Sequence, residues 1–518
     1  LKPLEVTLYN EVDAESAFDL FARTESVGQF EENFNVNLKL KEVESEEDVL
    51  RSIRQKLFFY KQDSLSEVRY AHISFYKMHA QEHHAVQPIN EMTSGIAIEG
   101  LYSSVPSMKD EENYKSGFGT KAYSIDEQNY LTRTIYYVNE LAANLRNGGN
   151  DSYRKGEAIF SRTTTADEKT LEKIFSASYW VTFIDPNMDL EFFNKYDGNL
   201  VVIHYSDQYS SSSRYDAITV TDKSEQYYAV IKEFLKQKEV EGKDDNVHNT
   251  IKAFNTFNGE WLLRVIGSKG HFDREKLSII SAIKYSVAYF DHPKILWVPI
   301  SLEEVLRVAG AVGLNKSEGV FTAKNLKVKG SYSDDLLLIG LENDENKLSL
   351  HFYPIEVKVG FNKTGVLDKA RTQVNKTKKL FYEALAGEQG ETFKGRFYRN
   401  FFAQLLISNA NKLDQSNFWK EKTYKLSDEI IEMLLKDDYE VSNRLVSYIG
   451  DGAILSFQKD AYHRSANLDD DVLLLNLTEK DGYEGLVIPI KKMQHWIQAK
   501  ENDFIKEDML SFKYKVNK

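Results

Sequence analysis

Apolar positions along the chain alternate between strand-like and helix-like spacing. Near the start, LEVTLYN (4–10) and YAHISFYK (70–77) show the period-two alternation of half-buried strands. Between them, SEEDVLRSIRQKLFFYK (45–61) has helical spacing behind Ser45, a residue type that caps helix N-termini. Strands that alternate with helices in this way indicate an α/β or mixed α+β fold.

The rest of the chain continues the same alternation. A long helical segment (126–145) is followed by two apolar strands, YWVTFID (179–185) and NLVVIHYS (199–206). The last part opens with a predicted helix at 301–312 and continues with a strand pair and a basic helix. Two more helices and three strands complete the prediction, the strands being AILSF (453–457), DVLLLNL (471–477) and EGLVIPI (484–490).

Three polar stretches interrupt these elements, at 79–95, 144–157 and 235–249. The length of 518 residues suggests about three domains. We therefore predict a multidomain protein with an N-terminal α/β domain, a middle α/β domain and a C-terminal domain, at 1–95, 96–295 and 296–518.

Composition excludes several classes of protein. The chain contains no cysteine, so it has no disulfide scaffold, no thiolate zinc site and no cysteine nucleophile. This composition fits a cytoplasmic protein, and no stretch approaches the roughly 18 apolar residues of a membrane span. The chain begins without methionine or a signal-type segment, so we expect it to be an internal piece of a longer protein.

The clearest chemical signal is an apolar strand pair at 333–360. Asp334 and Asp335 precede the first strand, and a polar turn from Glu342 to Asn346 is expected to lead into the second. The second strand carries Glu356 and Lys358, which period-two geometry places on one face. A hairpin would bring the aspartates beside Glu356, and such oxygen ligands suit Mg²⁺ or Mn²⁺. A neighbouring lysine suits hydrolysis of a phosphodiester.

The context of this E-x-K triplet makes it more specific than the motif alone. Two other matches, at 241–243 and 345–347, lie in polar connectors. Glu356 and Lys358 instead interrupt an apolar strand, where unpaired charges are costly. A purely structural ion pair is the alternative interpretation. Of the two aspartates, Asp335 is the first choice as metal ligand and Asp334 the second, because the apolar strand directly follows Asp335.

A basic helix follows the strand pair. From Lys358 to Arg399 there are ten Lys or Arg against four Asp or Glu, in a chain whose net charge is -13. Such a local surplus suits a phosphate backbone, although a solvated helix face is the alternative for any single lysine. Gln373 lies on this helix within possible reach of the site. The candidate DNA contacts are Lys369, Arg371, Lys376, Lys378, Lys379, Lys394, Arg396 and Arg399.

This order of helix, Asp-bearing strand, E-x-K strand and helix resembles the PD-(D/E)xK nuclease family. The resemblance implies a restriction-endonuclease-like core in 296–518, with a C-terminal extension and with Gln373 orienting the lysine or water. It also implies a possible accessory metal ligand on the first helix, at Glu303 or Glu304. Ser301 and Glu304 have capping-box spacing, which explains Glu304 without catalysis.

Segments across roughly 180–410, among them 179–193, 201–221, 254–265 and 295–314, resemble the DptH (DndH) family of DNA phosphorothioation-dependent restriction proteins. This resemblance implies a helicase-nuclease that acts with DptF- and DptG-like subunits on DNA that lacks the modification. No GxxxxGK[ST] motif occurs in the sequence, so we expect no ATP site here and place any motor outside this chain.

Three functions therefore remain as hypotheses. The first is a metal-dependent DNA endonuclease module of a bacterial defence system. The second is a non-cutting assembly or DNA-sensing module with a degenerate nuclease fold. The third is a nuclease of the same fold that acts on RNA or on single strands. His79, His83 and His84 have the spacing of zinc ligands, but we interpret 79–95 as a solvated loop without a third ligand.

Overall fold

The structure is a computed structural model of the 518-residue chain. It describes residues 3–10, 15–34, 38, 45–63, 69–78, 80–88, 93–97, 102–110, 113–118, 157–165, 168–184, 193, 200–205, 217–241, 243–257, 271–302, 335–344, 347–499 and 504–515. Within these residues the chain has a mixed α/β fold with three sheets, of which two are mixed and one is antiparallel.

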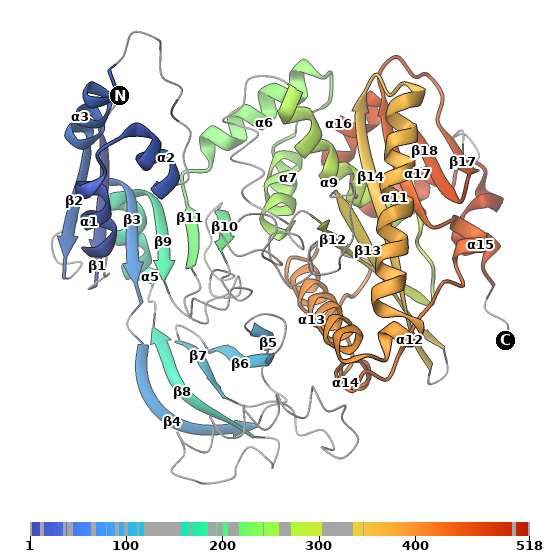
Figure 1. Ribbon diagram of the computed structural model, residues 1–518, viewed down its shortest axis with the longest axis horizontal. Helices are drawn as coiled ribbons and strands as arrows, with labels where there is room; N and C mark the ends of the chain where they lie inside the picture. Colours follow the sequence, from blue (N-terminus) through green and yellow to red (C-terminus); the bar gives the residue numbers. More distant parts are fainter. Residues whose placement is uncertain are drawn as a thin grey trace.

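The N-terminal sheet has six strands in the order β10-β11-β9-β3-β1-β2 (Figure 1, left). Its strands are β1 (Leu4–Tyr9), β2 (Leu57–Gln62), β3 (Ala71–Lys77), β9 (Ser178–Ile184), β10 (Val201–Tyr205) and β11 (Ala217–Thr221). Strands β2, β1, β3 and β9 are parallel, while β11 and β10 are antiparallel to their neighbours. Its helices are α1 (Glu15–Arg23), α2 (Val27–Phe34), α3 (Glu46–Lys56) and α5 (Glu168–Ala177).

A five-stranded antiparallel sheet in the order β4-β8-β7-β6-β5 occupies the lower part of Figure 1. Its strands are β4 (Ala80–Pro88), β5 (Thr93–Ala97), β6 (Tyr102–Asp110), β7 (Asn113–Phe118) and β8 (Glu157–Thr165). Strands β4 to β8, which lie between β3 and β9 in the sequence, thus form a sheet separate from the N-terminal one.

The C-terminal sheet follows the order β12-β13-β14-β16-β18-β17, and the short β15 (Glu440–Val441) pairs with β14. Its other strands are β12 (Ile295–Ser301), β13 (Leu336–Asp344), β14 (Lys347–Gly360), β16 (Gly452–Gln458), β17 (Ser465–Asp469) and β18 (Val472–Thr478). Strands β12, β13 and β14 are successively antiparallel, whereas β14, β16 and β18 are parallel.

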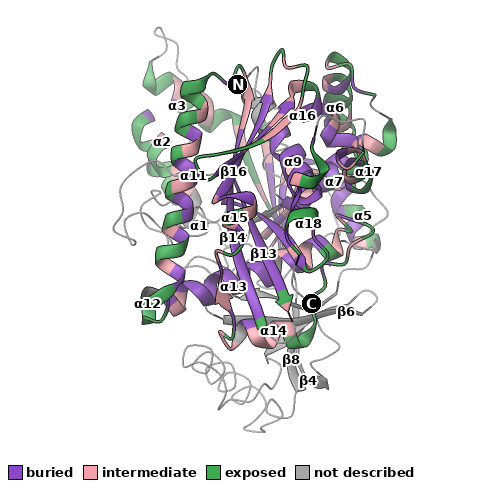
Figure 2. Ribbon diagram, turned by 90° about the vertical axis from the view of Figure 1, so that its right-hand side faces the viewer, coloured by how far each residue is buried: buried purple, intermediate pink, exposed green. Residues whose placement is uncertain are grey.

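Helices cover both faces of the C-terminal sheet, as Figure 2 shows. Helices α9 (His271–Tyr289), α16 (Glu479–Val487) and α17 (Ile490–Ile497) lie on one face, and α11 (Thr364–Leu385) lies on the other. The remaining elements are α6 (Glu225–Gln237), α7 (Asp244–Phe257), α12 (Gly387–Gly390), α13 (Phe393–Gln415), α14 (Asp428–Leu435), α15 (Val446–Ile449), η6 (Lys506–Asp508) and α18 (Leu510–Lys513). None of the described helices is long and apolar enough to cross a membrane.

Strand β14 is buried along most of its length because helices pack on both of its faces. On the α11 side, Ala370 and Val374 contact Ile454 and Val472. A Cβ at Gly452 would lie 2.5 Å from Val374 Cγ1, so this glycine allows α11 to approach the sheet closely. This close contact fixes the position of α11 along β14.

Most of the predicted elements are present. Strands form within the predicted ranges 4–10, 70–77, 179–185 and 199–206, a strand pair forms within 333–360, and the basic helix forms as α11. Ser45 caps α3 by accepting a hydrogen bond from Asp48 N. The predicted division at 95/96 and 295/296 stays a prediction, and strands on both sides of 95/96 share the N-terminal sheet.

Three of the predicted elements are wrong. Residues 57–62 form strand β2 rather than the end of the preceding helix, because they pair in parallel with β1. Residues 484–490 form the end of α16 and the start of α17 rather than a strand, since the Thr478 and Asp481 capping box begins a helix there. Residues 80–88 form strand β4 rather than a loop, paired with β8. The helix predicted at 126–145 and most of that predicted at 301–312 lie outside the described residues.

Gly340 provides a test of packing in the C-terminal sheet. A Cβ at this position would lie 2.6 Å from Trp297 Cζ3, and the indole is fixed because Nε1 donates to Phe290 O at 2.8 Å. We expect Gly340→Ala to cost about 1–3 kcal/mol through overpacking and to lower the thermal midpoint. Gly365→Ala is the matched control, since nothing lies within 4 Å of its Cβ position in α11. An unchanged midpoint in Gly340→Ala would contradict this packing.

Candidate active site

Asp335 lies at the start of β13, beside the second strand of the hairpin. The register pairs Leu336 with Ile355, so one further step places Asp335 opposite Glu356. The Asp335 carboxylate accepts a hydrogen bond from Val357 N at 2.8 Å, which holds its Oδ2 against β14. The structure therefore brings Asp335 and Glu356 together, as the hairpin prediction requires.

Glu356 and Lys358 form an ion pair on the α11 side of β14. The Glu356 side chain is 1% exposed, Lys358 is 23% exposed, and Lys358 Nζ lies 2.5 Å from Glu356 Oε1. Because Glu356 pairs with Ile454 across β14 and β16, it lies in the layer where Ala370 and Val374 of α11 pack. A buried carboxylate of this kind is costly without a compensating positive charge, which Lys358 supplies.

Gln373 is buried on the side of α11 that faces the sheet. Its neighbours Ala370 and Val374 contact Ile454, the strand partner of Glu356. Along the axis of α11, Gln373 therefore lies within about one helical turn of Glu356. This position agrees with the predicted role of orienting the lysine or water, which stays a prediction.

Two polar residues beside Lys358 were missed by the sequence interpretation. Ser456 pairs with Lys358 across β14 and β16, so the two side chains lie on one face. Asn362 donates from Nδ2 to Ser456 Oγ at 2.8 Å, and its backbone N donates to Gln458 Oε1 at 3.1 Å. The only signal in the sequence was a serine inside the otherwise apolar strand AILSF.

Two predicted DNA contacts are internal. Lys378 lies on the buried side of α11 and donates to Phe352 O at 3.0 Å, and burial lowers its pKa to about 8. Arg399 is buried as well, donating to Asp437 Oδ1 and to Tyr439 O, each at 2.6 Å. The Tyr439 ring also lies beneath its guanidinium. Both side chains bind groups within the protein, so neither is available to contact DNA.

The other predicted contacts divide into paired and exposed side chains. Arg371 is 18% exposed and bridges Asp368 and Asp469, which ties α11 to β17. Arg396 pairs with Glu391 at 2.7 Å, and Lys379 pairs loosely with Glu383. Lys369, Lys376, Lys379 and Lys394 are the exposed members of the set. Lys369, Lys376 and Lys379 lie on the outer side of α11, because residues separated by seven and by three positions fall on the same side of a helix.

Asp334, Glu303 and Glu304 lie outside the described residues, so the structure places none of them. Among the described residues, no group of three or more His, Asp or Glu side chains could hold a metal ion. Asp335 and Glu356 alone provide two carboxylates on adjacent strands, and oxygen donors of this kind fit a hard cation that keeps several waters.

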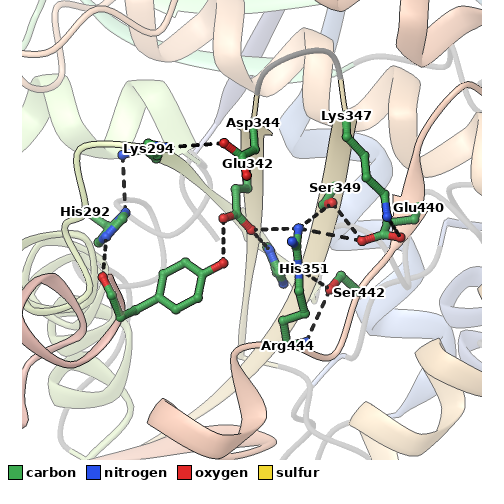
Figure 3. Close-up of polar contacts among 11 residues, drawn as sticks. His292, Lys294, Glu342, Asp344, Lys347, Ser349, His351, Glu440, Ser442 and Arg444 are labelled. Atoms are coloured by element: carbon green, nitrogen blue, oxygen red, sulfur yellow. Dashed lines mark hydrogen bonds and ion pairs between the residues drawn. The ribbon is translucent and has the colours of Figure 1, made fainter. Parts of the chain in front are cut away.

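A second polar cluster lies at the hairpin end of β13 and β14 (Figure 3). The sequence interpretation assigned Glu342 to a polar turn, which is wrong, because pairing continues to Asp344 and Lys347 and Glu342 is fully buried. Its carboxylate accepts hydrogen bonds from His351 Nε2 at 2.8 Å and from Tyr514 OH at 2.7 Å. Arg444 donates to the same carboxylate at 3.2 Å.

The Glu342 cluster is electrostatically balanced. Burial alone would raise the pKa of the Glu342 carboxyl, but hydrogen bonds from His351 and Tyr514 lower it below its usual value. Burial lowers the pKa of His351, against the opposing effect of Glu342. The neutral imidazole therefore donates to an ionised carboxylate, and the cluster holds the C-terminal segment against the sheet.

Comparisons with protein-family models, with curated proteins and with solved structures each found no match. The chemistry that the site can perform is therefore inferred from the geometry of its residues. Two carboxylates and a lysine converge at the end of β14, and such a set can bind a divalent cation and stabilise negative charge on a phosphate.

The Glu342 cluster predicts a loss of stability in acid. In the unfolded chain His351 takes up a proton near pH 6.5, whereas the folded imidazole does so only at lower pH. Stability is thus complete above that value and falls as the pH drops below it. We expect the thermal midpoint to decrease from neutrality to about pH 5, and to decrease less in His351→Asn.

His495→Asn is the control for this measurement, because His495 is exposed on α17. Its midpoint should follow the wild-type curve. His292, whose pKa burial also lowers, should preserve part of the slope in His351→Asn. A His351→Asn curve that is parallel to the wild type would exclude the cluster as a source of acid sensitivity.

Proposed function

We propose that the chain is a metal-dependent DNA endonuclease module that hydrolyses phosphodiester bonds. The observation that carries this proposal is the convergence of Asp335 with the Glu356 and Lys358 pair across β13 and β14. Burial of Glu356 within the sheet is costly, and a catalytic role accounts for that cost.

The order of elements supports a restriction-endonuclease-like core of the PD-(D/E)xK type. Strands β12, β13 and β14 are successively antiparallel, and after α11 the chain passes through α12 to α15 before it returns as β16, parallel to β14. The first helix that the resemblance implies, at 301–312, lies outside the described residues except at its start. In this arrangement the Asp-bearing strand, the E-x-K strand and the helix with Gln373 occur in the sequence order that the resemblance implies.

Asp335 and Glu356 would hold Mg²⁺ or Mn²⁺ in this proposal. A bound cation of this kind would polarise a phosphate oxygen and lower the pKa of a bound water. Lys358 would donate to the phosphate as negative charge develops on it, and Gln373 would orient the lysine or the water. Asn362, through Ser456, would keep the end of β14 in place beside Lys358.

The wider setting of the proposal is bacterial DNA restriction. On the basis of the segment resemblance, we propose that the module belongs to a cytoplasmic phosphorothioation-dependent defence system and acts with DptF- and DptG-like subunits and a helicase region outside this chain. A sulfur in place of a phosphate oxygen would be a poor ligand for a hard cation, which would favour unmodified DNA.

A non-cutting assembly or DNA-sensing module is the second candidate. The observation that favours it is that the described residues provide two carboxylates at the site and no group of three possible metal ligands. A titration with Mn²⁺ separates the two candidates: binding that is lost in Asp335→Asn favours the nuclease, and no binding favours the structural ion pair.

Substitution of the ion pair tests the nuclease directly. We expect Glu356→Gln and Lys358→Met to lower the cleavage of supercoiled plasmid with Mg²⁺ or Mn²⁺ by at least about a hundred-fold. The reason is that each variant removes a charge that would hold the cation or stabilise the transition state. Conversion of supercoiled plasmid to nicked and linear forms is the measurement.

The matched control is Glu383→Gln, which neutralises an exposed carboxylate on α11. Because loss of one partner of a buried pair is destabilising, the thermal midpoint of each variant must be measured as well. Equal cleavage by folded wild type, Glu356→Gln and Lys358→Met would remove the assignment.

The exposed lysines of α11 provide a test of DNA binding. We expect the double variant Lys369→Gln, Lys376→Gln to bind duplex DNA more weakly and with a shallower dependence on salt, by about one unit of slope per lost contact. Lys491→Gln, Lys492→Gln is the control, because α17 lies on the opposite face of the sheet (Figure 2). Equal slopes in the two double variants would exclude α11 as the DNA surface.

A further inference from the structure

Two loops meet at the end of β14, next to Lys358. The loop from β14 to α11 contains Phe361, and the loop from β16 to β17 contains Lys459 and Tyr462. Lys459 N donates to Gly360 O at 2.9 Å, which continues the parallel pairing of the two strands into the loops. Phe361 follows Lys358 by three residues, so the two lie within about 11 Å along the chain.

The backbone beneath Phe361 is held on several sides. Asn362 is buried and hydrogen-bonded to Ser456 and Gln458, and Lys363 N donates to Phe361 O at 3.1 Å. Gly360 has φ +112°, a conformation that favours glycine and turns the chain sharply before Phe361. The phenyl ring is therefore presented to solvent by a fixed loop, at 59% exposure.

The two loops carry positive charge near the exposed ring. Lys459 Nζ lies 4.8 Å from the centre of the Phe361 ring, and Lys363 is exposed at the start of α11. Helix α11 has no acidic residue in its first turn. Asp460 is the exposed acidic residue in the adjoining loop. Tyr462 adds a second ring in that loop, at 85% exposure.

We propose that Phe361, with Lys459 and Tyr462, forms a stacking surface for unpaired bases of a nucleic-acid strand that enters the site at Glu356 and Lys358. The flat ring would stack on a base while the neighbouring ammonium groups contact the phosphates on either side. This inference rests on the proposed nuclease function and names its substrate class, a single strand or an unpaired end.

The chemistry of the surface favours an unpaired strand over a duplex or a protein. In a duplex the faces of the bases are covered by their neighbours, so an exposed ring on a loop gains nothing by stacking. An apolar protein partner would leave the ammonium groups of Lys459 and Lys363 without a counter-charge at a desolvated contact. A single strand supplies both an aromatic face and regularly spaced negative charge.

Binding measured without cleavage tests this inference. Fluorescence anisotropy of the full chain in Ca²⁺ is compared for a labelled deoxythymidine oligomer and a labelled blunt duplex of equal length. We expect Phe361→Ala to weaken binding of the single strand by about five-fold or more and to change duplex binding by less than about two-fold. Phe361→Trp should retain the wild-type affinity, because it preserves a flat ring.

Tyr382→Ala is the matched control, an exposed aromatic residue farther along α11, and it should bind both probes as the wild type does. Unchanged single-strand binding by Phe361→Ala, or an equal loss of binding to the duplex, overturns the inference. Plasmid cleavage in Mg²⁺ separates the two proposals. Plasmid cleavage by the wild type together with unchanged single-strand binding by Phe361→Ala removes the stacking surface alone, whereas selective loss of single-strand binding in Phe361→Ala without any plasmid cleavage by the wild type removes the nuclease alone.

Discussion

The burial of strand β14 on both faces is the constraint on which the C-terminal part of the structure depends. Helix α9 covers one face and α11 the other, so every polar side chain on this strand must find a partner within the sheet or its helices. At one end His351 bonds to Glu342, and at the other Lys358 bonds to Glu356. Strand β14 thus contributes to two polar pairs of different exposure, one neutral imidazole with a carboxylate and one ion pair.

The difference in exposure distinguishes the structural pair of Glu342 and His351 from the proposed catalytic pair of Glu356 and Lys358. Glu342 and His351 are both nearly inaccessible, and Tyr514 and Arg444 complete the hydrogen bonds of the carboxylate. Lys358, in contrast, is partly exposed where the pairing of β14 with β16 ends. Because Lys358 reaches solvent, the proposed nuclease chemistry and the stacking surface are both assigned to this end of the strand.

The basic helix α11 illustrates how a charge count and a charged surface differ. Ten basic residues between 358 and 399 are visible in the sequence, but Lys378 and Arg399 are buried and Arg371 is held between two aspartates. A helix that packs on a sheet must bury one side, so part of its charge serves the fold. The exposed lysines of the outer side are the ones left for a phosphate backbone.

The sequence alone determined that the two apolar strands within 333–360 form a hairpin, because their short separation leaves few ways to pair them. It left the register open, and with it the choice between Asp334 and Asp335, because strands that are apolar on both faces can pair in more than one register. It could not determine contacts between distant segments, such as Tyr514 with Glu342, which lie 172 residues apart, or Arg399 with Asp437. Nor could the sequence show whether the apolar segment 484–490 is helical or extended, since a short apolar segment adopts the structure that its neighbours impose. Local periodicity is a property of neighbouring residues, whereas the burial of a charge is decided by whatever the rest of the chain packs against it.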